Sequence, residues 1–434
     1  MDSLTQSILL ELLNFSTNQN QKLFVVGGTL RDFLLQKPFS DFDLTGKDAA
    51  EMGINFSRSL NFTYISLDKT PGRRTVRVIL DQKKHLDFSD LQGMNIEEDL
   101  SRRDFTINAM AQPLPEFLSG IKVIIDPHKG REDLINKKIR VLQGPIISSD
   151  PLRMLRAFRF AATLNFEIDA NTLTNISLYK TRLNESASER IWHELTLFLK
   201  TSGTLPLLKI MHDCGLLDCI LPASNKTFVQ YQKVESLLKF PKKTFPEYSN
   251  ELNSKNFLNK HYLVKLSVLL MTQNSMSGTN LARDNAKDYN LQLSNSEKQL
   301  IKQAISGASS LTEIYLSSES NKYYELILKI HEEILTSVIL FVTYSNPPNT
   351  EDRTLFCKKL LKFYYGQFLP IVSKKLLLNG EDIIHQFKLS PSPLFGKILN
   401  CVQKEQVLGK ITTREEAIML AEDIIQSQTN EHRE

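Results

Sequence analysis

Short apolar runs with the alternating or continuous pattern of β-strands recur through the first 125 or so residues of the chain. These runs are LFVVGG, DFDLT, FTYISL, TVRVIL, HLDFSD and KVIID. Helical spacing of apolar positions separates them at 29–36 and 48–59, and the amphipathic stretch MDSLTQSILLELLNF precedes them. The pattern predicts a first helix followed by a mixed α/β region.

From about residue 130 onward, apolar positions recur almost wholly at helical spacing, as in REDLINKKI, DPLRMLRAFRFAATL, ASERIWHELTLFL and LPLLKIMHDCGLL. The stretch GPIISSDP at 144–151 is a candidate linker. We therefore expect an α+β protein whose mixed α/β head contains a small sheet. The expected domains are the head at 1–145, a helical neck at 146–200, a helical body at 201–320 and a helical tail at 321–434.

Composition adds little to this picture. The chain is 41% hydrophobic, and its 53 basic and 49 acidic residues give a net charge of +4, so any basic surface must be local. The four cysteines are scattered without metal or redox spacing, which indicates reduced thiols. With no signal-peptide pattern at the N-terminus and no apolar stretch of roughly 20 residues, we expect a cytoplasmic protein without membrane contact.

The stretch VVGGTLRD at 25–32 is a candidate phosphate site. A buried strand would end at Gly27 and Gly28, which let the backbone turn into a helix whose free N–H groups and dipole attract phosphate. Arg31, one turn along, could add a forked contact. The alternative is an ordinary strand, turn and helix.

Two carboxylates follow at Asp41 and Asp43. Residues i and i+2 of a strand share a face, so both side chains project together, and Mg²⁺ is the usual partner of such a pair. The alternative is a helix cap or a solvated pair. Asp87, in the run HLDFSD with Asp90 nearby, offers a third carboxylate on another strand. A D-x-D pair with a third acid is the arrangement of two-metal phosphoryl transfer.

The segment SDPLRMLRAFRF at 149–160 places Asp150, Arg153, Arg156 and Arg159 at offsets of three along an expected helix. Such a ribbon could face phosphates, and Asp150 with Arg153 could offer both an acceptor and donors to a nucleobase. The alternative is a solvated helix with salt bridges.

In this order, together with RRDFTINA at 102–109 and SERIWHEL at 188–195, the segments resemble the bacterial-type (class II) tRNA nucleotidyltransferase and poly(A) polymerase family. This family lies within the nucleotidyltransferase superfamily related to DNA polymerase beta. The likeness covers about residues 20–220, and GG-x-x-RD, D-x-D and RRDFTINA are the motifs that carry it.

The resemblance implies a role for each matching residue. Catalysis and Mg²⁺ binding fall to Asp41, Asp43 and Asp87. Nucleotide contacts fall to Gly27, Gly28, Arg31, Arg103, Asp104 and Asn108. Asp150 and Arg153 would read the base with the support of Arg156 and Arg159. The supporting residues are Asp32 and, in the E-R-x-x-x-E motif, Glu189, Arg190 and Glu194.

The implied activity is template-independent addition of C and/or A residues to a tRNA 3′ end from CTP and ATP, with release of pyrophosphate. The partners would be tRNA or another RNA 3′ end, and DNA is not expected. Ser149 stands where the family's base-reading motif has Glu, and the short connection from Asp87 to Arg102 is typical of members that add only CC. The alternatives are a poly(A) polymerase and a catalytically inactive RNA-binding relative.

Overall fold

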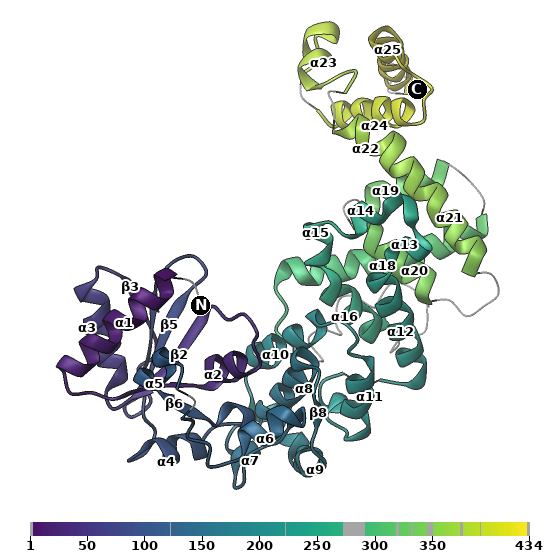
Figure 1. The fold of residues 1–434 in the computed structure, drawn as a ribbon. Coiled ribbons are helices and arrows are strands. Elements are labelled where there is room, and N and C mark those ends of the chain that lie inside the picture. Colours follow the sequence, from purple (N-terminus) through teal and green to yellow (C-terminus); the bar gives the residue numbers. More distant parts are fainter. Residues whose placement is uncertain are drawn as a thin grey trace. The chain divides into compact units, whose positions relative to one another are not determined.

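A computed structural model describes residues 3–121, 123–221, 223–271, 291–317, 321–330, 333–344, 350–373, 376–390 and 392–431. It divides the chain into two compact units (Figure 1). The first comprises Met1–Pro222 with Tyr289–Gln292, and the second Ala223–Asp288 with Leu293–Glu434. The α+β class is confirmed, because the sheet lies in the first unit and helices follow it. The finer division into neck, body and tail stays a prediction.

The first unit contains a six-stranded sheet in the order β3-β4-β5-β2-β1-β6. Its strands are β1 (Leu23–Val26), β2 (Asp41–Gly46), β3 (Thr63–Asp68), β4 (Thr75–Ile79), β5 (His85–Asp90) and β6 (Ala111–Pro113). β2 and β5 run parallel, and the other neighbouring pairs run antiparallel. The five strands expected from LFVVGG to HLDFSD are confirmed.

The strand expected at KVIID is wrong over its described part. Residue 122 lies outside the described residues, and within 123–126 the pairing is a single bridge from Ile125 to Ala111 of β6. The physical reason lies in the partner, because β6 is three residues long and ends at Pro113, which has no N–H to donate.

Alternation of side chains divides the sheet into two faces. Buried apolar residues of one face pack against α3 (Ala49–Ser59); they are Phe42, Leu44, Val76, Val78, Leu86 and Phe88. A Cβ on Gly53 of α3 would come within 2.6 Å of Phe88 Cδ2, so the helix packs closely only because residue 53 has no side chain. The opposite face carries the carboxylates of Asp41 and Asp43 from β2 and of Asp87 from β5.

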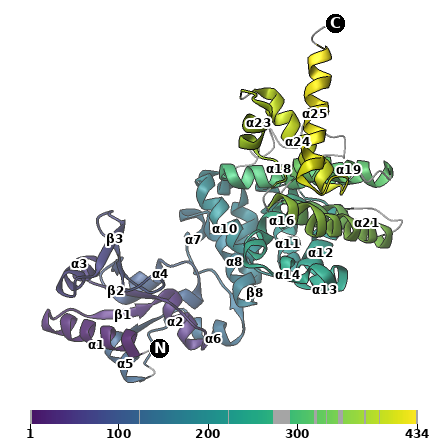
Figure 2. The ribbon, with the colours of Figure 1, turned by 90° about the horizontal axis from the view of Figure 1, so that it is seen from above.

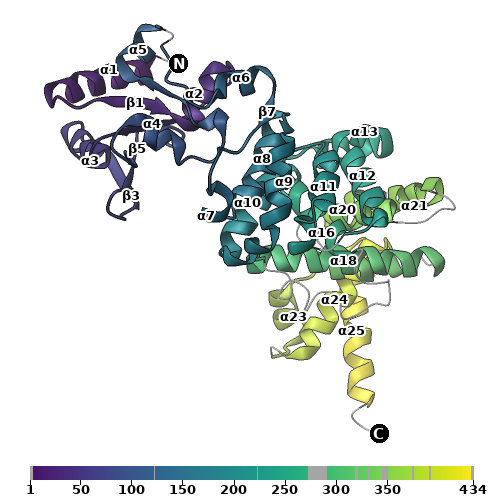
Figure 3. The same ribbon diagram turned by 90° about the horizontal axis from the view of Figure 1, so that it is seen from below.

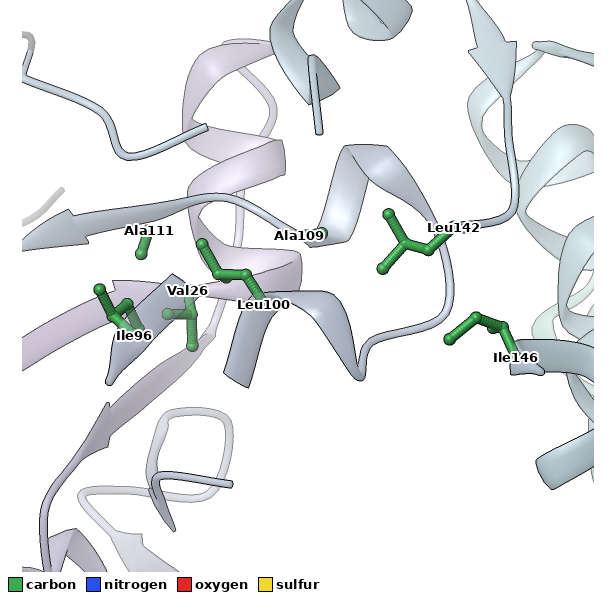
Figure 4. Close-up of a cluster of buried hydrophobic side chains, with 7 residues drawn as sticks. All are labelled: Val26, Ile96, Leu100, Ala109, Ala111, Leu142 and Ile146. Carbon is green, nitrogen blue, oxygen red and sulfur yellow. The ribbon is translucent and has the colours of Figure 1, made fainter. Parts of the chain in front are cut away.

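The other helices of this region are α1 (Ser3–Asn18), α2 (Gly27–Leu34), α4 (Ile96–Ser101), α5 (Leu114–Ser119), α6 (Gly130–Ile135) and the 3-10 turn η1 (Thr106–Asn108). Figure 4 shows an apolar cluster that packs α4 against β1, β6 and the segments around residues 109, 142 and 146. Its members are Val26, Ile96, Leu100, Ala109, Ala111, Leu142 and Ile146. This core fixes the RRDFTINA segment beside the end of β1, where the glycine pair begins α2.

Helices complete the first unit. They are α7 (Ile146–Ser149), α8 (Arg153–Leu164), α9 (Ala170–Tyr179), η2 (Lys180–Glu185), α10 (Ser188–Lys200), α11 (Leu205–Asp213) and η3 (Leu217–Cys219), with a two-stranded sheet of β7 (Lys138–Ile139) and β8 (Glu167–Ile168). α8 packs against α10 (Figure 3). The candidate linker at 144–151 contains the helical turn α7, whose Ile146 and Ile147 are buried.

The second unit is helical in its described part. Its elements are α12 (Asn225–Lys239), α13 (Pro241–Thr244), η4 (Pro246–Tyr248), α14 (Ser249–Leu252), α15 (Lys255–Leu258), α16 (His261–Met271), α18 (Asn295–Ser317), α19 (Asn321–Ile330), α20 (Ile334–Tyr344), α21 (Thr350–Phe363), η6 (Tyr364–Phe368), α22 (Leu369–Val372), α23 (Gly380–Phe387), α24 (Pro393–Val407) and α25 (Arg414–Glu431). The last three helices, α23, α24 and α25, lie together (Figure 2) and share a small apolar core. Across the described residues, no helix is long and apolar enough to span a membrane.

Candidate active site

Parallel pairing of β2 with β5 brings the carboxylates together. In the register Asp43 lies directly opposite Asp87, and Asp41 lies opposite His85. Because paired residues, and residues two apart on one strand, project from the same face, all three carboxylates point to the same side of the sheet. The side chain of Asp87 is 14% exposed, Asp43 is half-buried and Asp41 is exposed.

The glycine pair lies next to this strand. Gly27 has φ +61°, and a Cβ there would lie 3.1 Å from both Asp43 Oδ2 and Arg103 Nη1. Thr29 ties the turn to β2: its N–H donates to Asp43 Oδ2 at 3.3 Å, and its hydroxyl accepts from Asp43 N at 2.7 Å and donates to the Asp41 carbonyl at 2.9 Å. No local pattern indicates the Thr29 contacts, because their partners on β2 lie 12 and 14 residues along the chain and depend on the packing of α2 against β2.

The pKa of Asp43 is shifted by its surroundings. Burial raises its pKa, the Arg103 guanidinium lowers it, and the negative charge of Asp87 raises it again, with a net rise. A hydrogen bond from the Thr29 N–H opposes the rise. The carboxylate pair therefore favours a nearby cation.

Arg77 is a residue that the sequence analysis missed. From β4 its Nε donates to Asp87 Oδ1 at 2.8 Å and its Nη2 donates to Asp87 Oδ2 at 2.7 Å. The β4–β5 register pairs the two residues directly. The runs TVRVIL and HLDFSD could have shown this contact, because a hairpin between them pairs Arg with Asp at one register.

Arg31 is held inside the protein. Its guanidinium donates to Asp32 at 2.8 and 2.9 Å and to Asn108 Oδ1 at 2.8 Å, and it lies 5.1 Å from the Phe160 ring centroid. The residue is 8% exposed yet lines the cavity described below. The structure thus brings together Arg31 and Asn108, and Asp32 is a second partner of Arg31. Their contacts with a nucleotide stay a prediction.

Asp104 joins the RRDFTINA segment to α8. Its Oδ2 accepts from Arg156 Nη2 at 2.7 Å and Nε at 2.9 Å, and its Oδ1 accepts from Asn108 Nδ2 at 3.0 Å. Burial alone would raise the pKa of Asp104, but the Arg156 charge and the hydrogen bonds from Asn108, Arg156 and the Phe105 N–H lower it below its usual range.

Glu194 of α10 extends this network. Its Oε2 accepts from Arg159 Nε at 2.6 Å, and its Oε1 accepts from Arg156 at 3.4 Å. Arg159 lies 4.0 Å from the Phe160 ring centroid. Glu194 therefore supports α8, as the motif implied. Glu189, the first residue of the same motif, is exposed in the first turn of α10.

The expected base-reading pair is held by other groups. Arg153 donates to the carbonyl oxygens of Arg102 at 3.1 Å and Ile146 at 3.2 Å, and Asp150 accepts from Arg190 Nη2 at 3.2 Å. The expectation that Asp150 belongs to the arginine helix is wrong. α8 begins at Arg153, and Asp150 before it is extended (φ −145°, ψ 95°). The reason is Pro151, because a residue that precedes proline is sterically kept out of the helical conformation.

A cavity of about 620 Å³ unites most of the predicted residues. Those in its lining are Gly27, Gly28, Arg31, Asp43, Arg103, Asp104, Asn108, Asp150, Arg153, Arg156 and Arg190. The lining also includes residues that were not predicted, among them Arg73, Ser89, Gln92 and Arg102. Its volume falls in the usual range for small-molecule sites, and its arginines suit a phosphorylated ligand.

The three carboxylates provide oxygen ligands of the kind that a divalent cation such as Mg²⁺ prefers. In the described part of the chain no three His, Cys, Asp or Glu side chains are gathered as a metal site, so the carboxylates are neighbours in the register without converging. Asp43 and Asp87 offer hard oxygen donors on adjacent strands, and a cation would remove the repulsion that raises the pKa of Asp43. Each Asp87 oxygen accepts one hydrogen bond from Arg77 and keeps a second lone pair with which it could bind a cation.

Comparison with family models finds three matches. Residues 23–140 match a poly(A) polymerase head domain. Residues 165–227 match a probable RNA- and SrmB-binding site of polymerase A. Residues 289–421 match a putative second domain of tRNA nucleotidyltransferase.

Among curated proteins, the chain is 29% identical over 398 residues to a CC-adding tRNA nucleotidyltransferase of Geobacter sulfurreducens, covering 90% of this chain and 89% of that one. It is 26% identical over 409 residues to one of Synechocystis, covering 92% and 93%. A Thermotoga maritima CCA-adding enzyme complexed with tRNA shares the fold, with a TM-score of 0.72 and 21% identity, covering 99% of this chain and 96% of that one.

Proposed function

Because this chain belongs to the bacterial-type tRNA nucleotidyltransferase and poly(A) polymerase family, we propose that it transfers CMP from CTP to the 3′ end of tRNA and releases pyrophosphate. The observation that carries the proposal is the register of β2 and β5. This register sets Asp43 of β2 opposite Asp87 of β5. Thr29 connects Asp43 to the glycine turn through a hydrogen bond.

Addition of two C residues, without the final A, is the favoured form of the reaction. The connection from β5 to α4 is residues 91–95, and the resemblance associates a longer flexible loop there with completion of CCA. The Geobacter and Synechocystis relatives are both named CC-adding enzymes.

In the proposed mechanism the cavity holds the incoming CTP. The backbone N–H groups at the start of α2 and the Arg103 guanidinium would bind the triphosphate, and Asp104 with Asn108 would form the wall beside the ribose. Asp150 and Arg153 would face the base. These two side chains are preoriented by Arg190 and by the carbonyls of Arg102 and Ile146.

Nucleotidyltransferases of this superfamily generally use a divalent metal, and we propose Mg²⁺ held by Asp41, Asp43 and Asp87. When bound, Mg²⁺ supplies neutralisation of phosphate charge and a lowered pKa of the primer hydroxyl. The protein's own part is to align the α-phosphate between the glycine turn and the carboxylates, so that attack is in line and pyrophosphate departs toward the cavity.

A poly(A) polymerase remains the second candidate, because the match at 23–140 is to a poly(A) polymerase head domain. The test uses tRNA transcripts ending before CCA, after C and after CC, with an unrelated RNA as control, each with CTP alone or ATP alone. We expect CMP on the first two transcripts, stopping at CC, and no extension of the unrelated RNA. Long A tails on any RNA would instead establish the poly(A) activity.

A further inference from the structure

Directly paired residues form a row across the sheet face that carries the carboxylates. Asp43 of β2 pairs with Asp87 of β5, Asp87 pairs with Arg77 of β4, and Arg77 pairs with Ile65 of the edge strand β3. Because paired residues project from the same side of a sheet, these four side chains follow one another on one face.

The nucleotide cavity ends within this row. Asp43 lines the cavity with Gly27 and Gly28, whereas Asp87, Arg77 and Ile65 lie beyond its lining. In an in-line displacement, the attacking hydroxyl and the departing pyrophosphate lie on opposite sides of the α-phosphate. With the triphosphate at the glycine turn, the attacking hydroxyl would therefore approach along this row, from the side of Asp87, Arg77 and Ile65.

The part of the face on that side suits a nucleotide. Ile65 is apolar yet 48% exposed, and the neighbouring Leu67, at a β-bulge, is 51% exposed. The Arg77 side chain remains 30% exposed while it is held by Asp87. An apolar side chain offers van der Waals contact to a base or ribose, and a guanidinium attracts a phosphodiester.

We propose that Ile65 and Arg77 form the seat of the 3′-terminal nucleotide of the RNA primer. Its base or ribose would contact Ile65, its phosphodiester would face Arg77, and its 3′-hydroxyl would lie over Asp87. The inference rests on the proposed function and adds to it the surface that receives the acceptor end.

The chain offers a matched pair of variants for the test. Ile65 and Tyr64 are adjacent on β3 and both exposed, at 48% and 36%, but Tyr64 pairs with the buried Val78 and so belongs to the opposite face. In steady-state CMP incorporation, Ile65→Glu should raise KM for tRNA about tenfold, since it removes apolar contact and repels phosphate. KM for CTP should change less than twofold, and Tyr64→Glu should change neither.

A second measurement uses the unaltered protein. A tRNA whose last nucleotide is 4-thiouridine should crosslink, on irradiation, to a peptide containing 63–68 or 75–79. Crosslinks confined to other segments, or an Ile65→Glu protein that is folded and has an unchanged KM for tRNA, would overturn this inference alone. If the unaltered protein incorporates no nucleotide into tRNA, the proposed function fails and the inference with it.

Discussion

Arg77 on β4 holds both carboxylate oxygens of Asp87 on β5, at 2.8 and 2.7 Å. The pair fixes the orientation of Asp87 at the boundary between the nucleotide cavity and the proposed primer seat. Removing the guanidinium frees Asp87 to rotate and leaves it unshielded beside Asp43. Groups that orient metal-binding side chains commonly contribute 10- to 100-fold to metal affinity or activity.

Arg77→Ala should therefore lower kcat for CMP incorporation about 10- to 100-fold, and Arg77→Lys should restore part of the loss. The measurement is kcat against Mg²⁺ concentration, with Mn²⁺ binding followed by electron paramagnetic resonance. Arg182→Ala is the control, because Arg182 makes a similar two-bond pair with Glu185 on η2, outside the cavity lining. Equal behaviour of the two alanine variants would contradict the role of Arg77.

The glycine turn gives a second prediction. Gly27→Ala forces a side chain into the left-handed region and places a Cβ 3.1 Å from Asp43 and Arg103. Gly120→Ala carries the same backbone strain, at φ +76°, but its Cβ would meet nothing within 4 Å. Each change should cost about 1 kcal/mol of stability. Only Gly27→Ala should reduce kcat/KM for CTP, by about tenfold or more, and a similar loss in both variants would argue against the phosphate turn.

Base choice should depend on Arg153. Its guanidinium is held by the carbonyls of Arg102 and Ile146, so Arg153→Ala removes donors from a defined position. The ratio of kcat/KM for CTP to that for ATP should fall about tenfold, as expected when one recognition group is lost, with a smaller change in overall turnover. Arg131→Ala, an exposed change on α6 outside the cavity lining, should leave the ratio unaltered. An unchanged ratio in Arg153→Ala would contradict the base-reading assignment.

Acid stability should depend on Asp104. The pKa of Asp104 is lower in the folded protein than in the unfolded chain. The Asp104–Arg156 pair therefore stabilises the fold fully at pH values above the unfolded pKa, and this stabilisation is lost as pH falls through the folded pKa. Asp104→Asn should lower the free energy of unfolding by about 2 kcal/mol at pH 7, given that Arg156 keeps Glu194.

The difference between Asp104→Asn and the unaltered protein should begin to shrink as pH falls below about 4, the ordinary pKa of an aspartate, because the carboxyl of the unfolded chain then takes up a proton. It should shrink further as pH approaches the lowered pKa of Asp104 in the folded protein. Thermal unfolding from pH 7 to pH 3 measures it. Glu185→Gln, in an exposed ion pair, should change stability little at any pH. A constant difference across the range would mean that the ionised Asp104 carboxylate contributes nothing.

The sequence was sufficient for the local pattern and for residues whose partners are close in the chain. Five strands of the sheet, the D-x-D pair and the arginine helix follow from periodicity alone. Arg77 did not, because its partner is set by the register of β4 against β5, which the pattern of either strand leaves open. Helical spacing puts Asp150 on the arginine helix, but Pro151 holds it in an extended conformation before that helix begins.

The resemblance gave the residues around the cavity, but, apart from the support of α8 by Glu194, it did not give their contacts. Arg31 is bound to Asp32 and Asn108, and Arg156 to Asp104 and Glu194. Apart from the contact between the neighbours Arg31 and Asp32, these contacts join segments more than 30 residues apart in the chain, so periodicity within one segment carries no information on them.

In the proposed mechanism, the carboxylates of β2 and β5 are needed for the transfer. The most direct test is CMP incorporation into tRNA by Asp41→Ala with Asp43→Ala, measured beside tRNA affinity. We expect incorporation to fall by about 10³-fold or more, because loss of the metal ligands removes several kcal/mol of transition-state stabilisation, while RNA affinity stays within about twofold. Unchanged turnover in the double variant would contradict the account.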